Sequence, residues 1–343
     1  MSKSFWPEKD AEIERALNHA RDMRMCLPAA KRSGRDLLKR RVREGILLSP
    51  FPGVYEEPAY WRGLDPSEKS IRVIRAAALL HPSWVFCESS AAIAYELEVS
   101  CPNIEVIHVA NDSASHIRNT DHVKRLYFGG QPSVASGVKV TPLDRCVFDC
   151  ARNLDMPFAL AVTDSYARQK SLTPDDLVAE FARVGCGLHG IHRAQDVARL
   201  TDPRAEDGGE SVARGTMIEL GFASPELQVP FSDPFDSQRT YRVDFYWGKG
   251  ENGLPIIGEL DGLGKYTIAD GTTPEAGPGI APAAPHTASE PLHTALRNLS
   301  QERLRESRLT LGGAAVMRFD FATVLDKPRF ETLLTAFGVP RTS

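Results

Sequence analysis

The sequence predicts a mixed α/β fold built from three units that follow one another along the chain. Two helix-forming stretches and a hairpin come first, and helical stretches and apolar runs alternate over residues 61–200. Helix, strands and helix then fill residues 206–343, after a polar linker at Thr201–Gly209. A chain of 343 residues with 42% hydrophobic side chains can give each unit a core of its own.

Charge and cysteine content restrict the possible partners and the compartment. A net charge of -4 gives no whole-molecule attraction to nucleic acid, so any such affinity must come from local patches. The cysteines lie mostly in apolar segments without metal-ligand spacing, and Cys146 and Cys150 are expected as a buried pair on one helix face. The N-terminus lacks an apolar signal core, and no stretch is long enough to span a bilayer. We therefore expect a cytoplasmic protein without a membrane partner.

The first 60 residues predict a winged helix-turn-helix. Residues 10–25 and 29–44 are helix-prone, and the second stretch ends at Gly45. The runs Ile46–Leu48 and Gly53–Tyr55 then bracket a proline-containing turn, which is typical of a hairpin. Helix, helix and hairpin in this order form the predicted motif.

The second predicted helix divides into an apolar and a basic face. Its apolar stripe is formed by Leu37, Leu38 and Val42. The basic residues left for solvent or for DNA phosphates are Arg35, Lys39, Arg40 and Arg43. A simple solvated face is the alternative, since basic runs usually are that. The neighbouring hairpin favours DNA binding.

The segment from Leu38 to Tyr55 resembles the N-terminal winged-helix domain of AbiE-type antitoxins. The matching residues are Arg41, Gly45, Ile46, Gly53, Val54 and Tyr55. The resemblance continues through the middle region, where Cys87–Ala94 is similar to that family's Ser-Ala-Ala helix start. Thr141–Arg152 is similar to its Arg-x-x-x-Asp helix. This resemblance implies DNA as a ligand and a toxin protein as a possible partner.

Residues 61–200 predict a mixed α/β unit. Helices are expected near 66–80, 89–97, 143–153, 156–170 and 174–184, and strands at Trp84–Cys87, Ile104–Val109, Lys124–Phe128 and Val138–Val140. Arg145 and Asp149 stand four residues apart and are expected to pair, for only about a few tenths of a kcal/mol. The histidines of this region, His108, His116 and His122, show no carboxylate partner in the sequence and are interpreted as non-catalytic.

The last unit contains a cluster of acidic residues on two predicted strands, Tyr241–Trp247 and Leu254–Asp261. Residues two apart on a strand share a face, so Glu259 and Asp261 project together, and the neighbouring strand can bring Asp244 to them. Packed carboxylates repel one another unless a cation neutralises them. Bound Mg²⁺ can activate a water and shield a phosphodiester, which is the chemistry of a nuclease.

Residues around this cluster extend the pattern. A helix at Gly209–Gly221 carries Glu210 near its start, and Gln228 follows in a third apolar run. Lys265 lies four residues after Asp261 on a glycine-bearing turn. Together these residues resemble the restriction-endonuclease-like superfamily, whose order is a helix Glu, then Asp, then Glu-x-Lys. The chain is more closely similar to the branch of very-short-patch-repair endonucleases, in which Asp-Phe and Glu-x-Asp-Gly recur.

The resemblance covers residues 206–343 and implies an α/β/α domain. It implies Glu210, Asp244 and Glu259 as metal ligands. Asp261 departs from the pattern, because most of the superfamily has Lys there, so Lys265 would have to supply the positive charge. The alternative is that the aspartates are strand-end acids in turns and that Glu259 pairs with an arginine.

The end of the chain predicts further elements around this site. Residues 267–291 are rich in proline, alanine and glycine and are expected to form a mobile insert. A helix over 293–311, a strand over 314–321 and a closing helix over 326–337 are expected after it.

Two functions from different classes follow. The first is a Mg²⁺-dependent endodeoxyribonuclease that the winged helix positions on DNA. Its catalytic residues would be Asp244, Glu259, Asp261 and Lys265, and its metal ligands Glu210, Asp244 and Glu259, with the Leu260 carbonyl as a further ligand. The second is an antitoxin-like transcriptional repressor whose last unit is an inactive scaffold for a toxin.

Overall fold

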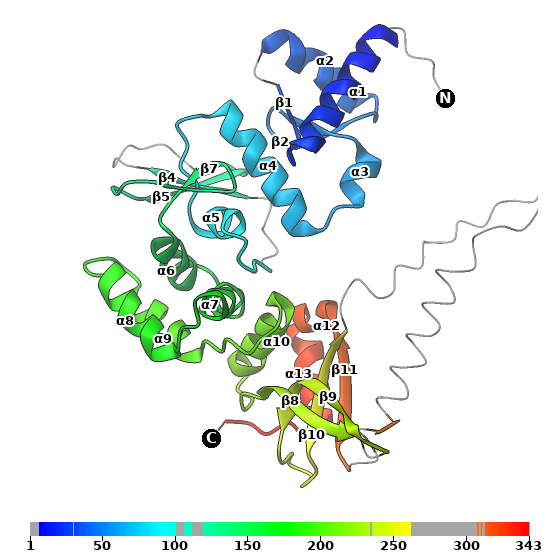
Figure 1. Ribbon diagram of the computed structural model, residues 1–343, viewed down its shortest axis with the longest axis vertical. Helices are drawn as coiled ribbons and strands as arrows, with labels where there is room; N and C mark the ends of the chain where they lie inside the picture. Colours follow the sequence, from blue (N-terminus) through cyan, green and yellow to red (C-terminus); the bar gives the residue numbers. More distant parts are fainter. Residues whose placement is uncertain are drawn as a thin grey trace, which may run out of the picture. The chain divides into compact units, whose positions relative to one another are not determined.

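The computed structural model describes residues 7–29, 31–100, 106–111, 119–233, 235–261, 307–308, 310 and 313–342. The chain has a mixed α/β fold, as the sequence predicted, in two compact units that comprise residues 1–203 and 204–343 (Figure 1). The predicted segments 1–60 and 61–200 therefore belong to one unit.

The first unit begins with helix α1 (Pro7–Asp22), the short strand β1 (Leu27–Pro28) and helix α2 (Arg32–Arg43). A hairpin of β2 (Leu48–Phe51) and β3 (Val54–Glu56) follows. β1 was not predicted, and it pairs antiparallel with β3 to give a sheet in the order β1-β3-β2. Leu17, Leu38 and Tyr55 are buried between the helices and this sheet. Helix, helix and hairpin thus occur in the expected order.

The rest of the first unit has seven helices and four strands in the described residues. The helices are α3 (Pro58–Arg62), α4 (Pro66–Leu80), α5 (Glu88–Ala94), α6 (Leu143–Asn153), α7 (Met156–Lys170), α8 (Pro174–Val184) and α9 (Ile191–Leu200). The strands are β4 (Ile107–Asn111), β5 (Val123–Tyr127), β6 (Ser133–Ala135) and β7 (Val138–Val140). β4 and β5 run parallel, whereas β6 and β7 form an antiparallel pair.

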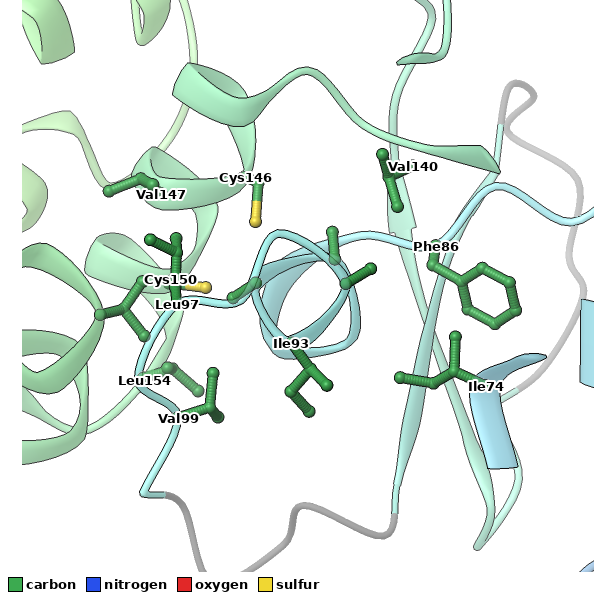
Figure 2. Packing of buried hydrophobic residues seen from close by; sticks show 14 of the residues in the cluster. Ile74, Phe86, Ile93, Leu97, Val99, Val140, Cys146, Val147, Cys150 and Leu154 are labelled. Carbon is green, nitrogen blue, oxygen red and sulfur yellow. The ribbon is translucent and has the colours of Figure 1, made fainter. Parts of the chain in front are cut away.

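Helix α5 lies at the centre of this unit. All of its residues are buried. Figure 2 shows Phe86 and Val140 on one side of it and the cysteines of α6 on the other. Cys146 and Cys150 are both fully buried thiols, as predicted for a core pair. The interior of the unit is therefore built around α5, so that any polar group at the start of α5 is buried as well.

The second unit begins with α10 (Gly208–Glu219) and continues into a sheet of β8 (Glu226–Asp233), β9 (Asp236–Trp247), β10 (Ile256–Asp261) and β11 (Ala315–Asp320). Helices α12 (Phe321–Leu325) and α13 (Lys327–Ala336) follow. The strand order is β11-β10-β9-β8, and only the β10–β11 pair among these is parallel. The two acid-bearing strands are thus adjacent, as the sequence predicted.

One face of this sheet packs on the described helices. Phe319 of β11 stacks on Phe245 of β9 at 5.8 Å and meets Phe330 of α13 at 4.9 Å, measured between ring centroids. An added Cβ at Gly209 would lie 3.1 Å from Cδ2 of Leu260, so glycine allows the start of α10 to come close to β10. The start of α10 is therefore fixed next to the acidic end of β10.

Several expectations differ from the structure. The predicted strand Trp84–Cys87 is reduced to isolated bridges made by Phe86, which joins β4 and β7. Thr201, expected in a linker, is buried and donates a 2.9 Å hydrogen bond to the Thr163 hydroxyl. The predicted insert 267–291 and most of the helix predicted over 293–311 lie outside the described residues. No helix in the described part of the chain is long and apolar enough to cross a bilayer.

Candidate functional site

Asp244 and Glu259 lie at the same end of the β9–β10 pair in the second unit. β9 and β10 pair antiparallel up to Phe245 opposite Gly258, and Asp244 and Glu259 are the next residues beyond this last pair on their strands. The Leu260 amide donates a hydrogen bond of 2.9 Å to Oδ2 of Asp244, which holds this carboxylate against β10. The structure therefore brings two of the predicted site residues together.

Glu210 reaches the same sheet through Gln228. The Glu210 side chain is buried, and its Oε2 accepts hydrogen bonds from the amide of Glu206 at 2.8 Å and from Nε2 of Gln228 at 3.1 Å. In the β8–β9 register Gln228 stands opposite Asp244. Its φ of +56° is a left-handed conformation that costs energy in a residue with a side chain. The fold thus maintains a strained glutamine between the buried Glu210 and the acidic strands.

Asp261 is paired with an arginine. Arg318 of β11 donates to Oδ1 of Asp261 in an ion pair, and the parallel register places Arg318 directly opposite Glu259. The end of β10 therefore carries the guanidinium group of Arg318, which the sequence analysis did not assign to this site. This ion pair is close to the alternative considered for these carboxylates, in which an arginine pairs with an acid of β10.

The chemistry of these side chains suits Mg²⁺, because carboxylate oxygens are its preferred protein ligands. Their placement supplies two adjacent carboxylates, Asp244 and Glu259. Among the described residues, no three Asp, Glu, His or Cys side chains form a group that could hold a metal ion. Lys265, the predicted source of positive charge, lies outside the described residues.

Helix α2 of the first unit presents the predicted DNA-binding residues to solvent. Arg35, Lys39, Arg40 and Arg43 are all exposed. Arg40 forms an ion pair of 2.9 Å with Glu44, which partly neutralises the positive charge that Arg40 could offer to a ligand. Within the described part of the chain, Lys39 and Arg43 form no ion pair, and they stand four residues apart on one face. These two residues are the strongest candidates for contact with a phosphate.

His108 corrects an expectation from the sequence. It was expected to lack a carboxylate partner, yet its Nε2 lies 3.1 Å from Oε1 of Glu88, so that expectation was wrong. Its Nδ1 is 2.9 Å from the Ser89 hydroxyl, and Asn153 donates a 2.9 Å hydrogen bond to Oε2 of Glu88. The cluster of Glu88, Ser89, His108 and Asn153 arises because α5 packs on β4, which residue spacing did not indicate. The resemblance at Cys87–Ala94 was the only sequence signal near it.

Burial sets the protonation of this cluster. It raises the pKa of Glu88 to about 7, against the opposing hydrogen bond from Asn153. It also lowers the pKa of His108 to about 4, with the positive charge of Lys124 acting in the same direction. His108 is therefore neutral at pH 7, and Glu88 is close to half-protonated. Glu88 also has a φ of +48°, so the backbone is strained where this acid is held.

Comparison with known proteins identifies related sequences but does not indicate what this chain does. No protein-family model matches this chain. Two uncharacterized proteins of Mycobacterium tuberculosis, from strains CDC 1551 and H37Rv, are each 28% identical to it over 190 residues. The matched part is 54% of this chain and 68% of each relative. The resemblances to AbiE-type antitoxins and to restriction endonucleases therefore stay predictions.

Proposed function

We propose that this protein is a DNA endonuclease in which α2 binds duplex DNA and the second unit cleaves it with Mg²⁺ as cofactor. The observation that carries this proposal is the hydrogen bond from the Leu260 amide to Asp244, which holds this carboxylate against β10 next to Glu259, with Glu210 connected to β8 through Gln228. Carboxylate oxygens are the protein ligands that Mg²⁺ prefers, which favours a metal at this place.

Each residue has a defined role in this proposal. Asp244 and Glu259 would hold the metal, with Glu210 and the Leu260 carbonyl as further ligands. Mg²⁺ held there would supply an activated water and would shield the phosphodiester. Asp261 is a further catalytic acid next to these ligands, and Lys265 supplies a positive charge that stabilises the attacking water.

A plasmid assay with matched variants tests cleavage. Wild-type protein with Mg²⁺ is expected to nick or cut supercoiled DNA, and Asp244→Ala is expected to reduce the rate by at least about a hundredfold, because the metal supplies several kcal/mol of transition-state stabilisation. Glu251→Ala, an exposed acid in the same unit, is the control and is expected to cut at the wild-type rate. DNA affinity should be equal in all three proteins. A wild-type protein that shifts DNA on a gel without cutting it would contradict the endonuclease proposal.

A second function is favoured by the ion pair between Asp261 and Arg318. An arginine bound to a predicted catalytic acid fits a second unit that has lost cleavage and serves as a scaffold for a toxin. The protein would then be an antitoxin-like repressor that binds its own promoter through α2. Sequence-specific retardation of its promoter fragment, with no cleavage of any DNA in Mg²⁺, would support this function over the first.

DNA binding by α2 has a separate test. Lys39→Ala is expected to weaken binding to all duplex sequences and to reduce the slope of log affinity against log salt by about 1, because one phosphate contact is lost. Arg40→Ala should act in the same direction and more weakly, since Glu44 already pairs with it. Fluorescence anisotropy at several salt concentrations measures both quantities. Lys170→Ala, at the exposed end of α7, is the matched control, and equal slopes for Lys39→Ala and Lys170→Ala would remove α2 as the DNA-binding helix.

A further inference from the structure

The first unit contains a pocket of about 560 Å³ that the proposed function does not use. Its walls come from the start of α5, from β4 and β5, and from the turn between α6 and α7. This volume is within the range of small-molecule sites, which is about 300–1,000 Å³. All of these elements belong to one compact unit, so the pocket is built by the fold of that unit itself.

Glu88 and His108 form a hydrogen-bonded part of the pocket wall. Three hydrogen-bonding side chains fix this pair: Ser89 bonds His108, Asn153 bonds Glu88, and the Ser90 hydroxyl accepts from the His108 amide at 2.9 Å. The left-handed backbone of Glu88 costs on the order of 1–3 kcal/mol. The fold thus holds a buried, strained carboxyl group at the edge of a pocket, and such strain is concentrated at ligand sites.

Cationic side chains form the other part of the wall. Lys124 of β5 is opposite His108 in the parallel register, so the two share a face. Arg125 and Arg152 also line the pocket. Arg152 is fixed by Asp149, whose Oδ1 lies 2.7 Å from its Nη2. Lys124 is exposed and, within the described part of the chain, pairs with no acid.

Charge and shape together specify a class of ligand. Three cationic side chains line the pocket against two acids, Glu88 and Asp155. Glu88 is close to half-protonated at pH 7, so the wall is net positive there. Leu154 and Phe158 add an apolar surface beside these charges. A ligand that satisfies all of them has an anionic head and an apolar or aromatic body.

We propose that this pocket binds a small organic anion, a phosphomonoester or a carboxylate, with its charged head at Lys124 and Arg152 and its body against Phe158. Protonation of Glu88 removes a negative charge from the pocket wall beside the head. Asn153, which lines the pocket next to Glu88, offers a further polar contact.

Nucleophilic catalysis by Ser89 is the competing interpretation, since Ser89, His108 and Glu88 form a hydrogen-bonded chain. A nucleophile must reach the substrate. Ser89 is 4% exposed, and it does not line the pocket, whereas Glu88 and His108 do. Ser89 therefore orients the imidazole from the interior, and the geometry points to binding rather than to acyl transfer.

Titration of full-length protein with phenyl phosphate, benzoate and the neutral control phenol tests the proposal. Isothermal calorimetry is expected to show saturable binding of one or both anions and none of phenol. Lys124→Met is expected to weaken this binding by at least about tenfold, the effect of losing one hydrogen bond to a charged group. Lys170→Met makes the same charge change outside the pocket and should leave affinity unchanged. The anion that binds more tightly distinguishes a phosphomonoester from a carboxylate site.

The pH dependence of benzoate affinity distinguishes binding in this pocket from nonspecific binding to the protein surface. Benzoate stays ionised between pH 6 and 8, so a change in its affinity reports on the protein. The charged or titratable groups around Glu88 are His108 on β4, Lys124 on β5, Arg152 and Asp149 on α6, Asp155 after α6, and the buried thiols of Cys87, Cys146 and Cys150. Of these, Glu88 titrates near 7, and wild-type protein should therefore bind benzoate more tightly at pH 6, whereas Glu88→Gln should show no such dependence. Absence of saturable binding, or equal affinities in Lys124→Met and wild type, would overturn the proposal.

Discussion

Asp149→Ala is expected to destabilise the first unit by about 3–5 kcal/mol, because it removes the shared partner of two arginines from a buried position. Asp149 is 1% exposed, and its carboxylate lies 2.9 Å from Nε of Arg145 and 2.7 Å from Nη2 of Arg152. Burial raises the pKa of Asp149 even against these two positive charges, which shows how strongly the site is desolvated. Without the carboxylate, both guanidinium groups lose their compensating charge.

Asp144→Ala provides the matched comparison, because Asp144 stands on the same helix. It pairs with Arg183 at 3.0 Å, and both side chains are largely accessible to water, with 31% and 67% exposed. An exposed pair of this kind contributes at most about 1 kcal/mol. Hydrogen exchange of amides in the first unit, followed by mass spectrometry, measures the stability of that unit alone. Equal losses in the two variants would show that burial does not determine the strength of the Asp149 cluster.

This cluster also shows what the sequence could and could not predict. The four-residue spacing of Arg145 and Asp149 correctly predicted that they pair, since helix geometry alone decides this. The expected contribution of a few tenths of a kcal/mol applies to an exposed pair on a helix, whereas Asp149 is buried. Spacing does not reveal that Asp149 is buried, nor that Arg152 binds the same carboxylate from three residues further on.

The acidic site was predictable to the same extent. The two apolar runs indicated adjacent strands, and Asp244 and Glu259 are the next residues beyond the last pair of β9 and β10. Arg318 was not predictable, because it lies 57 residues after Asp261 on a strand that joins the sheet in parallel. A parallel pair has no turn that fixes its register, so the arginine at this site is visible only in three dimensions.

The pair of Glu88 and His108 was missed for a related reason. The two residues are 20 positions apart, and the segment between them includes most of α5 and residues outside the described part of the chain. Their contact depends on how α5 packs on β4, which is a tertiary feature. A buried acid and a buried histidine have opposite effects on the pH dependence of stability, so the pair can be tested through its linkage to folding.

The stabilities of Glu88→Gln and His108→Gln are expected to change in opposite directions as the pH rises. The pKa of Glu88 is raised on folding from 4.5 to about 7, so its contribution is present below pH 4.5 and is lost as the pH rises through 7. The pKa of His108 is lowered from 6.5 to about 4, so its contribution is present above pH 6.5 and is lost as the pH falls through 4. Between pH 4.5 and 6.5 these slopes oppose each other in the wild-type protein.

A variant that lacks one member of the pair shows how the other member alone makes stability depend on pH. Glu88→Gln is expected to lose up to roughly 3 kcal/mol of stability, relative to its own value at pH 7, as the pH falls to 4, because the pKa of His108 is 6.5 in the unfolded chain and about 4 in the folded protein. His108→Gln is expected to lose a similar amount as the pH rises from 4.5 to 7. Hydrogen exchange of the first unit at pH 4.5, 5.5, 6.5 and 7.5, corrected for intrinsic exchange rates, measures both slopes. Glu14→Gln, an exposed acid on α1, is the control. If Glu88→Gln and Glu14→Gln gave parallel curves, the buried pair would not control the pH response of this unit.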